Sequence, residues 1–242
     1  MRKSIAAVVI AASAATSACS KTHAEDGGAT VSRNYQVGAF DQIEVAGPYN
    51  VQVRTGANPS VSARGPEKMI DHMTVEVRDG KLVIRTERQK GWFHTGWNFH
   101  GNVELTVTVP ELHGAAIAGS GDIKVDQVRG DHFDGSVAGS GGLDVGSLDV
   151  QNLKLAIAGS GGVKAGSGKA QNANFEIAGS GDIDAKGIQV QTADVSIAGS
   201  GNIAANATGT ADVSIMGSGD VQLTGGAKCK ISKAGSGNVS CS

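Results

Sequence analysis

The sequence predicts an all-β protein in which an antiparallel N-terminal part leads into a parallel β-helix, or β-solenoid, with coils of about 20 residues. We expect a right-handed β-helix, because crossover connections between parallel strands are almost always right-handed. A short x-Gly-Ser-Gly motif recurs at nearly constant spacing through the second half. Apolar residues flank each copy at fixed offsets, and residues 31–110 alternate between apolar and polar with a period of two. We expect residues 31–242 to form one continuous domain.

Residues 1–18 have the features of a signal peptide. Arg2 and Lys3 precede an apolar stretch, residues 5–15, which is too short to cross a bilayer. Small residues before Cys19 favour lipidation of that cysteine, although Thr16 stands where lipoproteins usually have leucine. Ordinary cleavage, after Ala18 or after Ala24, is the alternative. Both interpretations place the protein outside the cytoplasm, at the outer membrane, in the periplasm or at the cell surface of a bacterium. A polar tether follows at residues 19–30.

Residues 31–110 are expected to form an antiparallel β region. Apolar residues alternate on both sides of Gly47-Pro48, and they do so again around Asp79-Gly80, a dipeptide typical of hairpin turns. Residues 102–109 form a further strand that ends at Pro110, and residues 64–73 allow a short helical turn.

The segment of residues 90–101 is rich in aromatic side chains in a chain that has only 4% of them. We expect either that its rings pack as a buried lid over the end of the β-helix, or that they form an exposed platform for a ligand. The candidate ligand-binding residues are Trp92, Phe93, His94, Trp97, Asn98, Phe99 and His100.

Residues 111–242 form the repeat array. Counting from the first glycine of each x-Gly-Ser-Gly, apolar residues recur at positions −4, −2, +4 and +6, which predicts two short strands joined by a tight turn. One extra copy, residues 165–168, is out of register, and we expect it in a loop. The first glycines, predicted to form the turn column, are Gly119, Gly139, Gly159, Gly179, Gly199, Gly217 and Gly235.

Two polar columns follow each turn glycine. Serine occupies position +1 of every coil and, with no histidine after His132, indicates a stacked turn rather than nucleophiles. Asp or Asn at position +3, as at Asp122 and Asp182, predicts turn-stabilising hydrogen bonds along a ladder. Because the period does not fit calcium-binding repeats, we expect no metal, no cofactor and no catalytic residue in these columns.

Position +5 predicts a charge column on the outer face. In four successive coils it reads Lys124, Asp144, Lys164 and Asp184. Since neighbouring strands lie about 5 Å apart, opposite charges would alternate along the column.

The two C-terminal cysteines are expected to form a disulfide. Cys229 and Cys241 lie symmetrically about the last turn glycine and share parity with inward-facing residues. In that coil Lys233 replaces the usual apolar residue at position −2, so a crosslink would support a weakened end.

The chain resembles the family of bacterial proteins described as "putative auto-transporter adhesin, head GIN domain". The resemblance rests on "FDQIEVAGPYNVQV" (40–53), "VEVRDGKLVI" (75–84), "VTVPELHGAAIAGSGDI" (107–123) and the Gly-Ser-Gly repeats. It implies an exported or lipid-anchored envelope protein with a β-helical body, and it supplies no catalytic residues.

A non-catalytic binding or adhesion module is therefore the first functional hypothesis, with the envelope surface, a glycan or a protein as partner. A structural spacer is the second. A carbohydrate-active enzyme is the third, because Asp182 and Asp184 are the only close carboxylate pair within one coil and we expect no cluster around them. The net charge of −2 argues against nucleic acid. We expect membrane contact only through a lipid anchor, and the sequence leaves the oligomeric state open.

Overall fold

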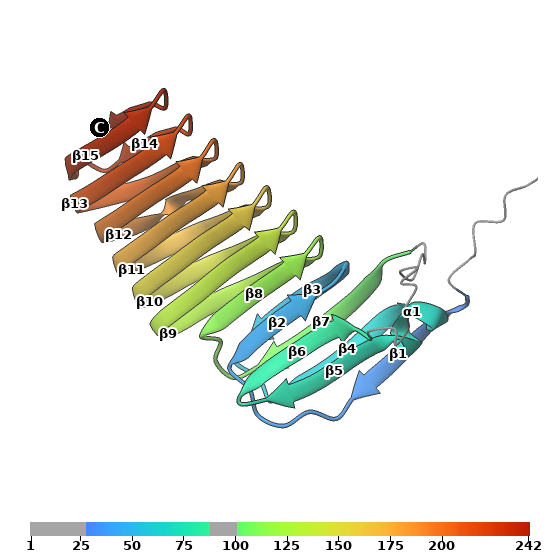
Figure 1. Cartoon of the computed structure of the whole chain (residues 1–242). Helices are drawn as coiled ribbons and strands as arrows, with labels where there is room; N and C mark the ends of the chain where they lie inside the picture. Colours follow the sequence, from blue (N-terminus) through green and yellow to red (C-terminus); the bar gives the residue numbers. More distant parts are fainter. Residues whose placement is uncertain (1–27, 88–100) are drawn as a thin grey trace, which may run out of the picture.

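The structure is a computed structural model that describes residues 28–87 and 101–242. It is an elongated β-solenoid with an antiparallel layer at its N-terminal end (Figure 1). The N-terminal elements are β1 (Thr30–Tyr35), β2 (Gln42–Ala46), β3 (Tyr49–Thr55), β4 (Ser60–Pro66), α1 (Glu67–Asp71), β5 (Met73–Arg78), β6 (Lys81–Thr86), β7 (Val103–Val109) and β8 (Gly114–Gly119). The elements of the array are β9 (Asp122–Gly139), β10 (Gly142–Gly159), β11 (Gly162–Gly179), β12 (Asp182–Gly199), β13 (Asn202–Gly217), β14 (Val221–Thr224), β15 (Lys228–Gly235) and β16 (Val239–Cys241).

The predicted parallel β-helix is confirmed. Each long strand of the array winds once around the rod and pairs in parallel with the strands of the previous and next coils. The register is one full repeat, so that Leu143 lies opposite Val163 and Ile157 opposite Ile177. Equivalent apolar residues therefore stack inside the rod, where they form one continuous core.

Each coil has a third inward-facing stretch that the sequence analysis missed. In β10, Leu148 and Val150 are buried between the two predicted apolar stretches. The equivalent stretch of β11 holds the out-of-register Gly-Ser-Gly, where Gly168 pairs with Leu148. The expected loop at residues 165–168 is therefore wrong, because these residues continue a strand whose inward side chain at that point is replaced by glycine.

The turn column behaves as predicted. All seven turn glycines have a positive φ, between 128° and 140°. At Gly159 the backbone also approaches the preceding coil so closely that a Cβ atom would overlap the carbonyl oxygen of Gly139. Only glycine combines this conformation with this approach, which explains why the repeat keeps it in every coil.

The interpretation of residues 42–55 as an antiparallel pair is wrong. β2 and β3 do not pair with each other, because they are the two walls of one solenoid coil. Gly47 has a φ of 145° and donates its N–H to the carbonyl of Ala118 at 3.1 Å, so it occupies the place of a turn glycine. The apolar alternation is the same in a hairpin and in a coil, which is why the sequence pattern did not separate them.

The spatial order of the coils differs from their order in the chain. β6 pairs in parallel with β2, and β7 pairs in parallel with β3. The coil made by β6 and β7 therefore lies outside the coil made by β2 and β3, which in turn stacks on β8 and β9. Residues 88–100, which lie outside the described residues, come between β6 and β7 in the chain.

Antiparallel strands close the N-terminal end, as predicted for this part of the chain. β5 forms a hairpin with β6 through Asp79 and Gly80, both of which have a positive φ. β4 pairs with β7 and β1 pairs with β4 on the other wall. The short helix α1 lies within the predicted helical turn, and it buries Met69 and Ile70 against this end of the core.

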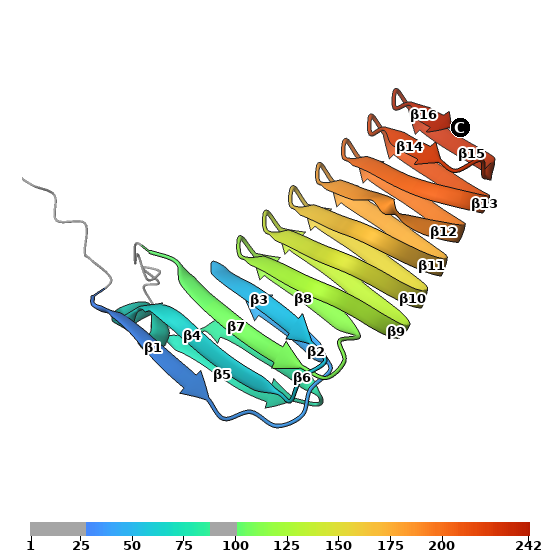
Figure 2. The same cartoon turned by 180° about the vertical axis from the view of Figure 1, so that it is seen from behind.

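The C-terminal end is an open coil, seen from behind in Figure 2. β15 pairs with β13, and β16 pairs with β14, and none of the described strands lies beyond them. Cys229 and Cys241 form a disulfide across this coil with their Cα atoms 6.7 Å apart, as the sequence predicted. Lys233 occupies the inward position and donates from Nζ to the carbonyl of Gly237 at 2.8 Å.

Several predictions fall on residues outside those described. These are the signal peptide at residues 1–18, most of the tether with its lipidation site Cys19, and the aromatic residues of the 90–101 segment, so they stay predictions. Within residues 28–87 and 101–242, no helix has the length and hydropathy needed to cross a membrane.

Candidate functional site

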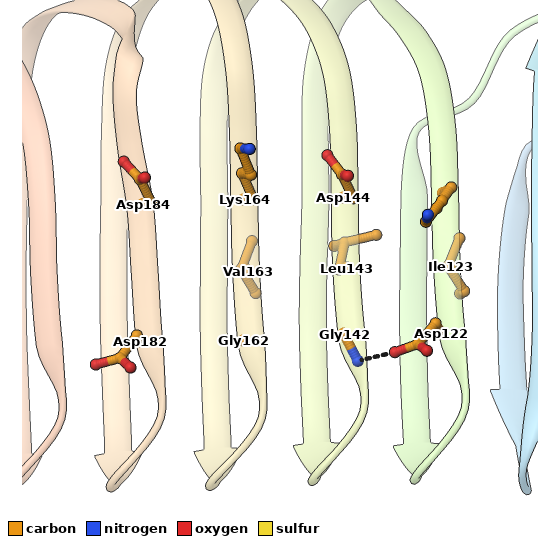
Figure 3. A pocket seen from close by; sticks show the side chains of 11 residues that line it. Asp122, Ile123, Gly142, Leu143, Asp144, Gly162, Val163, Lys164, Asp182 and Asp184 are labelled. Carbon is orange, nitrogen blue, oxygen red and sulfur yellow. Dashed lines mark hydrogen bonds between the residues drawn. The ribbon is translucent and has the colours of Figure 1, made fainter.

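A shallow groove runs across the outer wall of coils β9 to β12, with a volume of about 410 Å³ (Figure 3). We call it the axial groove, because it runs along the rod and across the strands. Its side walls are the residues at positions +3 and +5 of four successive coils. Those residues are Asp122, Lys124, Gly142, Asp144, Gly162, Lys164, Asp182 and Asp184.

Two glycines open the groove. Asp122 and Asp182 stand at position +3 in the first and fourth coils, whereas Gly142 and Gly162 hold the same position in the two coils between them. Figure 3 shows the two aspartates separated by these bare backbone positions. The missing side chains leave a gap three coil spacings wide, or about 14 Å.

The position +3 column is mainly structural, as the sequence predicted. Asp122 Oδ1 accepts from the N–H of Gly142 at 2.8 Å, and Asp182 Oδ1 accepts from the N–H of Asn202 at 3.1 Å. The ladder continues through Asp220, whose N–H donates to Asn202 and whose carboxylate accepts from the N–H of Asn238. These side chains hold neighbouring turns together and have less capacity left for a ligand.

The position +5 column is different, because three of its four charges are unpaired. Lys124, Asp144 and Lys164 lie in register on adjacent strands, as predicted. Among the described residues, however, none of these three side chains forms an ion pair or a hydrogen bond. Asp184, at the end of the column, is 3.7 Å from Lys186 Nζ. The column therefore presents free donors and acceptors alternately to solvent.

The groove continues toward the N-terminal end. A second hollow, of about 280 Å³, shares Asp122 and Lys124 with it and extends over β3 and β7. The register places Asn50 and Glu104 in line with Asp122, and Gln52 and Thr106 in line with Lys124. We call the two hollows together the axial strip. The residues that extend the strip beyond the groove are Asn50, Gln52, Glu104 and Thr106.

The extension also offers free polar groups. Within the described part of the chain, the side chains of Asn50, Gln52 and Glu104 make no hydrogen bond or ion pair. An amide supplies both donors and acceptors, whereas an ionised carboxylate only accepts. The strip thus joins an uncharged section on β3 with a section of alternating charge on β9 to β12.

Asp182 and Asp184 share the groove wall with Asp122, Asp144 and two lysines, which come from different coils. Asp122 and Asp182 are three coil spacings apart, so the groove arranges these carboxylates in rows along the rod rather than around one point. Among the described residues, no three His, Cys, Asp or Glu side chains are placed to hold a metal ion together.

The most direct sequence signal for the groove was the pair of glycines at position +3. Their column otherwise holds Asp or Asn, so Gly142 and Gly162 mark a local loss of side-chain volume on one wall. The residues predicted as a ligand site, in the 90–101 segment, lie outside the described residues. The turn glycines stack in one column, in which Gly159 lies in register with Gly139 and Gly179.

Comparisons with known proteins agree with this architecture. The profile of the family described as "Putative auto-transporter adhesin, head GIN domain" matches residues 39–227. No curated protein sequence matches the chain significantly.

Solved structures resemble almost the whole rod. A crystal structure titled as a putative adhesin from Bacteroides fragilis is 26% identical, covers 87% of this chain and 96% of its own, and has a TM-score of 0.77. A structure titled as a putative lipid binding protein from Parabacteroides distasonis is 25% identical, covers 89% and 98%, and has a TM-score of 0.72. A structure titled as a putative adhesin from Parabacteroides merdae, at 18% identity with a TM-score of 0.69 and coverage of 88% and 96%, is similar in fold alone.

Proposed function

Because the chain belongs to the family described as "Putative auto-transporter adhesin, head GIN domain", we propose that it is a non-catalytic binding module of the bacterial cell envelope. Its axial strip would hold a hydroxyl-rich ligand such as a glycan. Support comes from the adhesin description of the family and of the related structure from Bacteroides fragilis.

One observation carries the proposal. Lys124, Asp144 and Lys164 lie in one row within a groove, yet these side chains do not pair with each other. A row kept only for stability would gain most from ion pairs, although exposed pairs contribute only about 0–1 kcal/mol each. Sugar hydroxyls donate to carboxylates and accept from ammonium groups, so an alternating row matches a polyhydroxyl ligand.

Glycan binding is tested by applying the purified protein to a glycan array. We expect selective binding that is lost in the double variant Lys124→Ala/Asp144→Ala. The matched control is Lys154→Ala/Glu176→Ala, which removes an exposed ion pair of 3.3 Å outside the strip. If no glycan binds selectively, or if both variants bind equally well, the proposal that the strip recognises a glycan is wrong. Hydrolysis of a bound polysaccharide would replace the proposal with the enzyme hypothesis.

The aromatic segment remains a second candidate for ligand contact. Trp92 and Trp97 stand between β6 and β7 in the chain, and β7 carries Glu104 at one end of the strip. We propose that these rings add stacking contacts to the same ligand. The double variant Trp92→Ala/Trp97→Ala is expected to stay folded and to bind glycan more weakly. Unfolding of the variant would favour the buried lid instead.

We also propose that the protein is exported and anchored through a lipid on Cys19. The basic and apolar N-terminal residues and the small residues before Cys19 support this. Metabolic labelling with a fatty acid, followed by membrane fractionation, tests it. The wild type should be labelled and sediment with membranes, whereas Cys19→Ser should be unlabelled and soluble. An unlabelled wild type would favour ordinary signal cleavage.

A further inference from the structure

We infer that the ligand of the axial strip is an extended, neutral or cationic polysaccharide that runs along the solenoid axis and crosses the strands. The inference rests on the proposed function, and it adds the length, direction and charge of the ligand. It follows from three properties of the strip, which are its continuity, its excess of carboxylates and its lack of apolar anchors.

Continuity sets the length and direction. The two hollows share Asp122 and Lys124, so they form one surface from β7 through β3 and β9 to β12. These are six adjacent strands in the sheet order. At a strand spacing of about 4.8 Å, the strip is about 24 Å long. One monosaccharide would occupy only a small part of it, whereas an oligosaccharide lying across the strands would meet equivalent positions in each coil.

Charge sets the chemical class. Five carboxylates, on Glu104, Asp122, Asp144, Asp182 and Asp184, line the strip together with the ammonium groups of Lys124 and Lys164. Lys186 pairs with Asp184, so the other four carboxylates still outnumber the two lysines. This excess repels anionic polymers such as acidic polysaccharides and nucleic acids. Carboxylates are strong acceptors for hydroxyl and ammonium groups, which favours a neutral sugar or an amino sugar.

An extended peptide fits the strip less well. The strands beneath it pair with neighbours on both sides, so they offer no free edge to which a peptide could add as a strand. Peptide recognition also uses apolar anchors in pockets. Among the described residues, the exposed large apolar side chains are Met216 and Ile231, and both lie outside the strip.

The experiment is isothermal titration with three sets of 1,4-linked probes, namely β-linked chito-oligosaccharides, their de-acetylated amino-sugar counterparts and α-linked oligogalacturonates. Each set runs from dimer to hexamer. We expect affinity for the first two sets to rise at least about tenfold from dimer to hexamer, or about 1.4 kcal/mol. We expect oligogalacturonates to bind most weakly at every length.

A far-end variant tests whether one ligand spans the strip. Gln52 and Glu104 are exposed on β3 and β7, so Gln52→Ala/Glu104→Ala should fold normally, which circular dichroism checks. We expect it to weaken binding of the hexamer about tenfold, whereas Lys154→Ala/Glu176→Ala should leave binding unchanged.

The possible failures are distinguishable. If no saccharide binds, the proposed glycan function fails. If saccharides bind with the same affinity at every length, or if the Gln52→Ala/Glu104→Ala variant binds the hexamer normally, the extended ligand is wrong while the groove remains a site. Tightest binding of oligogalacturonate would overturn the charge argument. Equal binding of an oligolysine peptide would show that the strip recognises positive charge rather than carbohydrate.

Discussion

At the scale of single residues, the backbone requirement of the turn explains the repeat better than any side chain does. Gly159 has a φ of 134°, and a side chain there would overlap the backbone of the previous coil. Its neighbour Ser160 is exposed and recurs in every coil without a side-chain hydrogen bond among the described residues. The glycine column was predictable from the sequence, because a positive φ at the turn favours glycine and glycine therefore recurs at the same position of every repeat.

Gly159→Ala is therefore expected to destabilise the protein by about 2–4 kcal/mol, from backbone strain and overlap between coils. Ser160→Ala, one residue further along, should change the free energy of unfolding by less than about 0.5 kcal/mol. Denaturant unfolding of the two variants measures both effects. Equal stability of the two would mean that the turn does not need glycine at this position.

The two tyrosines of the chain give a second test at the residue scale. Burial raises the pKa of Tyr35 and of Tyr49 above the ordinary value of 10.0, although the Thr86 hydroxyl beside Tyr49 partly lowers its pKa. The folded state therefore retains both protons longer than the unfolded state. The stability from this effect is complete below pH 10 and is lost as pH rises through the folded pKa values.

Spectrophotometric titration of tyrosinate should accordingly show both tyrosines ionising above pH 10 in the folded protein. Tyr49→Phe should remove one of the two steps and reduce the loss of stability at alkaline pH. A tyrosine that titrates at its ordinary pKa would contradict the packing of the N-terminal end.

At the scale of elements, strands were predictable and their partners only in part. The alternation in residues 42–55 correctly indicated two strands, yet β2 and β3 pair with other coils rather than with each other. Period-two alternation states which side chains face inward, and it contains no information about the neighbouring strand. The hairpin of β5 and β6 was predictable because Asp79-Gly80 specifies its own turn.

The end coil makes a prediction about self-association. Lys233 stands where other coils bury an apolar residue, and an inward-pointing charge discourages strands of another molecule from adding to an open edge. Lys233→Ile should therefore promote end-to-end association, measured by sedimentation velocity. Lys228→Ile adds the same apolar side chain at an outward position of β15 and should stay at the wild-type state of association. If both variants associate, the cause is non-specific association through the added apolar side chain rather than the loss of the inward charge.

The disulfide of the end coil should act locally. The bond between Cys229 and Cys241 closes a loop with a sequence separation of 12, for which the chain-entropy model gives about 3 kcal/mol. In the Cys229→Ser/Cys241→Ser variant, we expect faster hydrogen exchange in β15 and β16 and unchanged exchange in β9 to β11. Two free thiols in the wild-type protein would rule the bond out.

At the scale of the whole molecule, the sequence predicted a rod but not the surface that the rod assembles. Asn50, Glu104 and Asp122 are far apart in the chain, and they meet only because the coil of β6 and β7 stacks outside the coil of β2 and β3. The array register, by contrast, was readable because each coil repeats the last. The axial strip combines residues of the N-terminal coils with residues of the array. It therefore depends on the order in which these coils stack, and the repeat pattern does not indicate that order.

We propose that the wall of the rod that carries the axial strip is the binding surface. Backbone amide chemical shifts of the isotope-labelled protein, titrated with the chito-oligosaccharide hexamer, test it most directly. We expect chemical-shift changes concentrated at residues 50–52, 104–106, 122–124, 142–144 and 162–164, with little change on the opposite wall, as at residues 194–196 and 212–214. Changes confined to the opposite wall, or no changes at saturating hexamer, would contradict it.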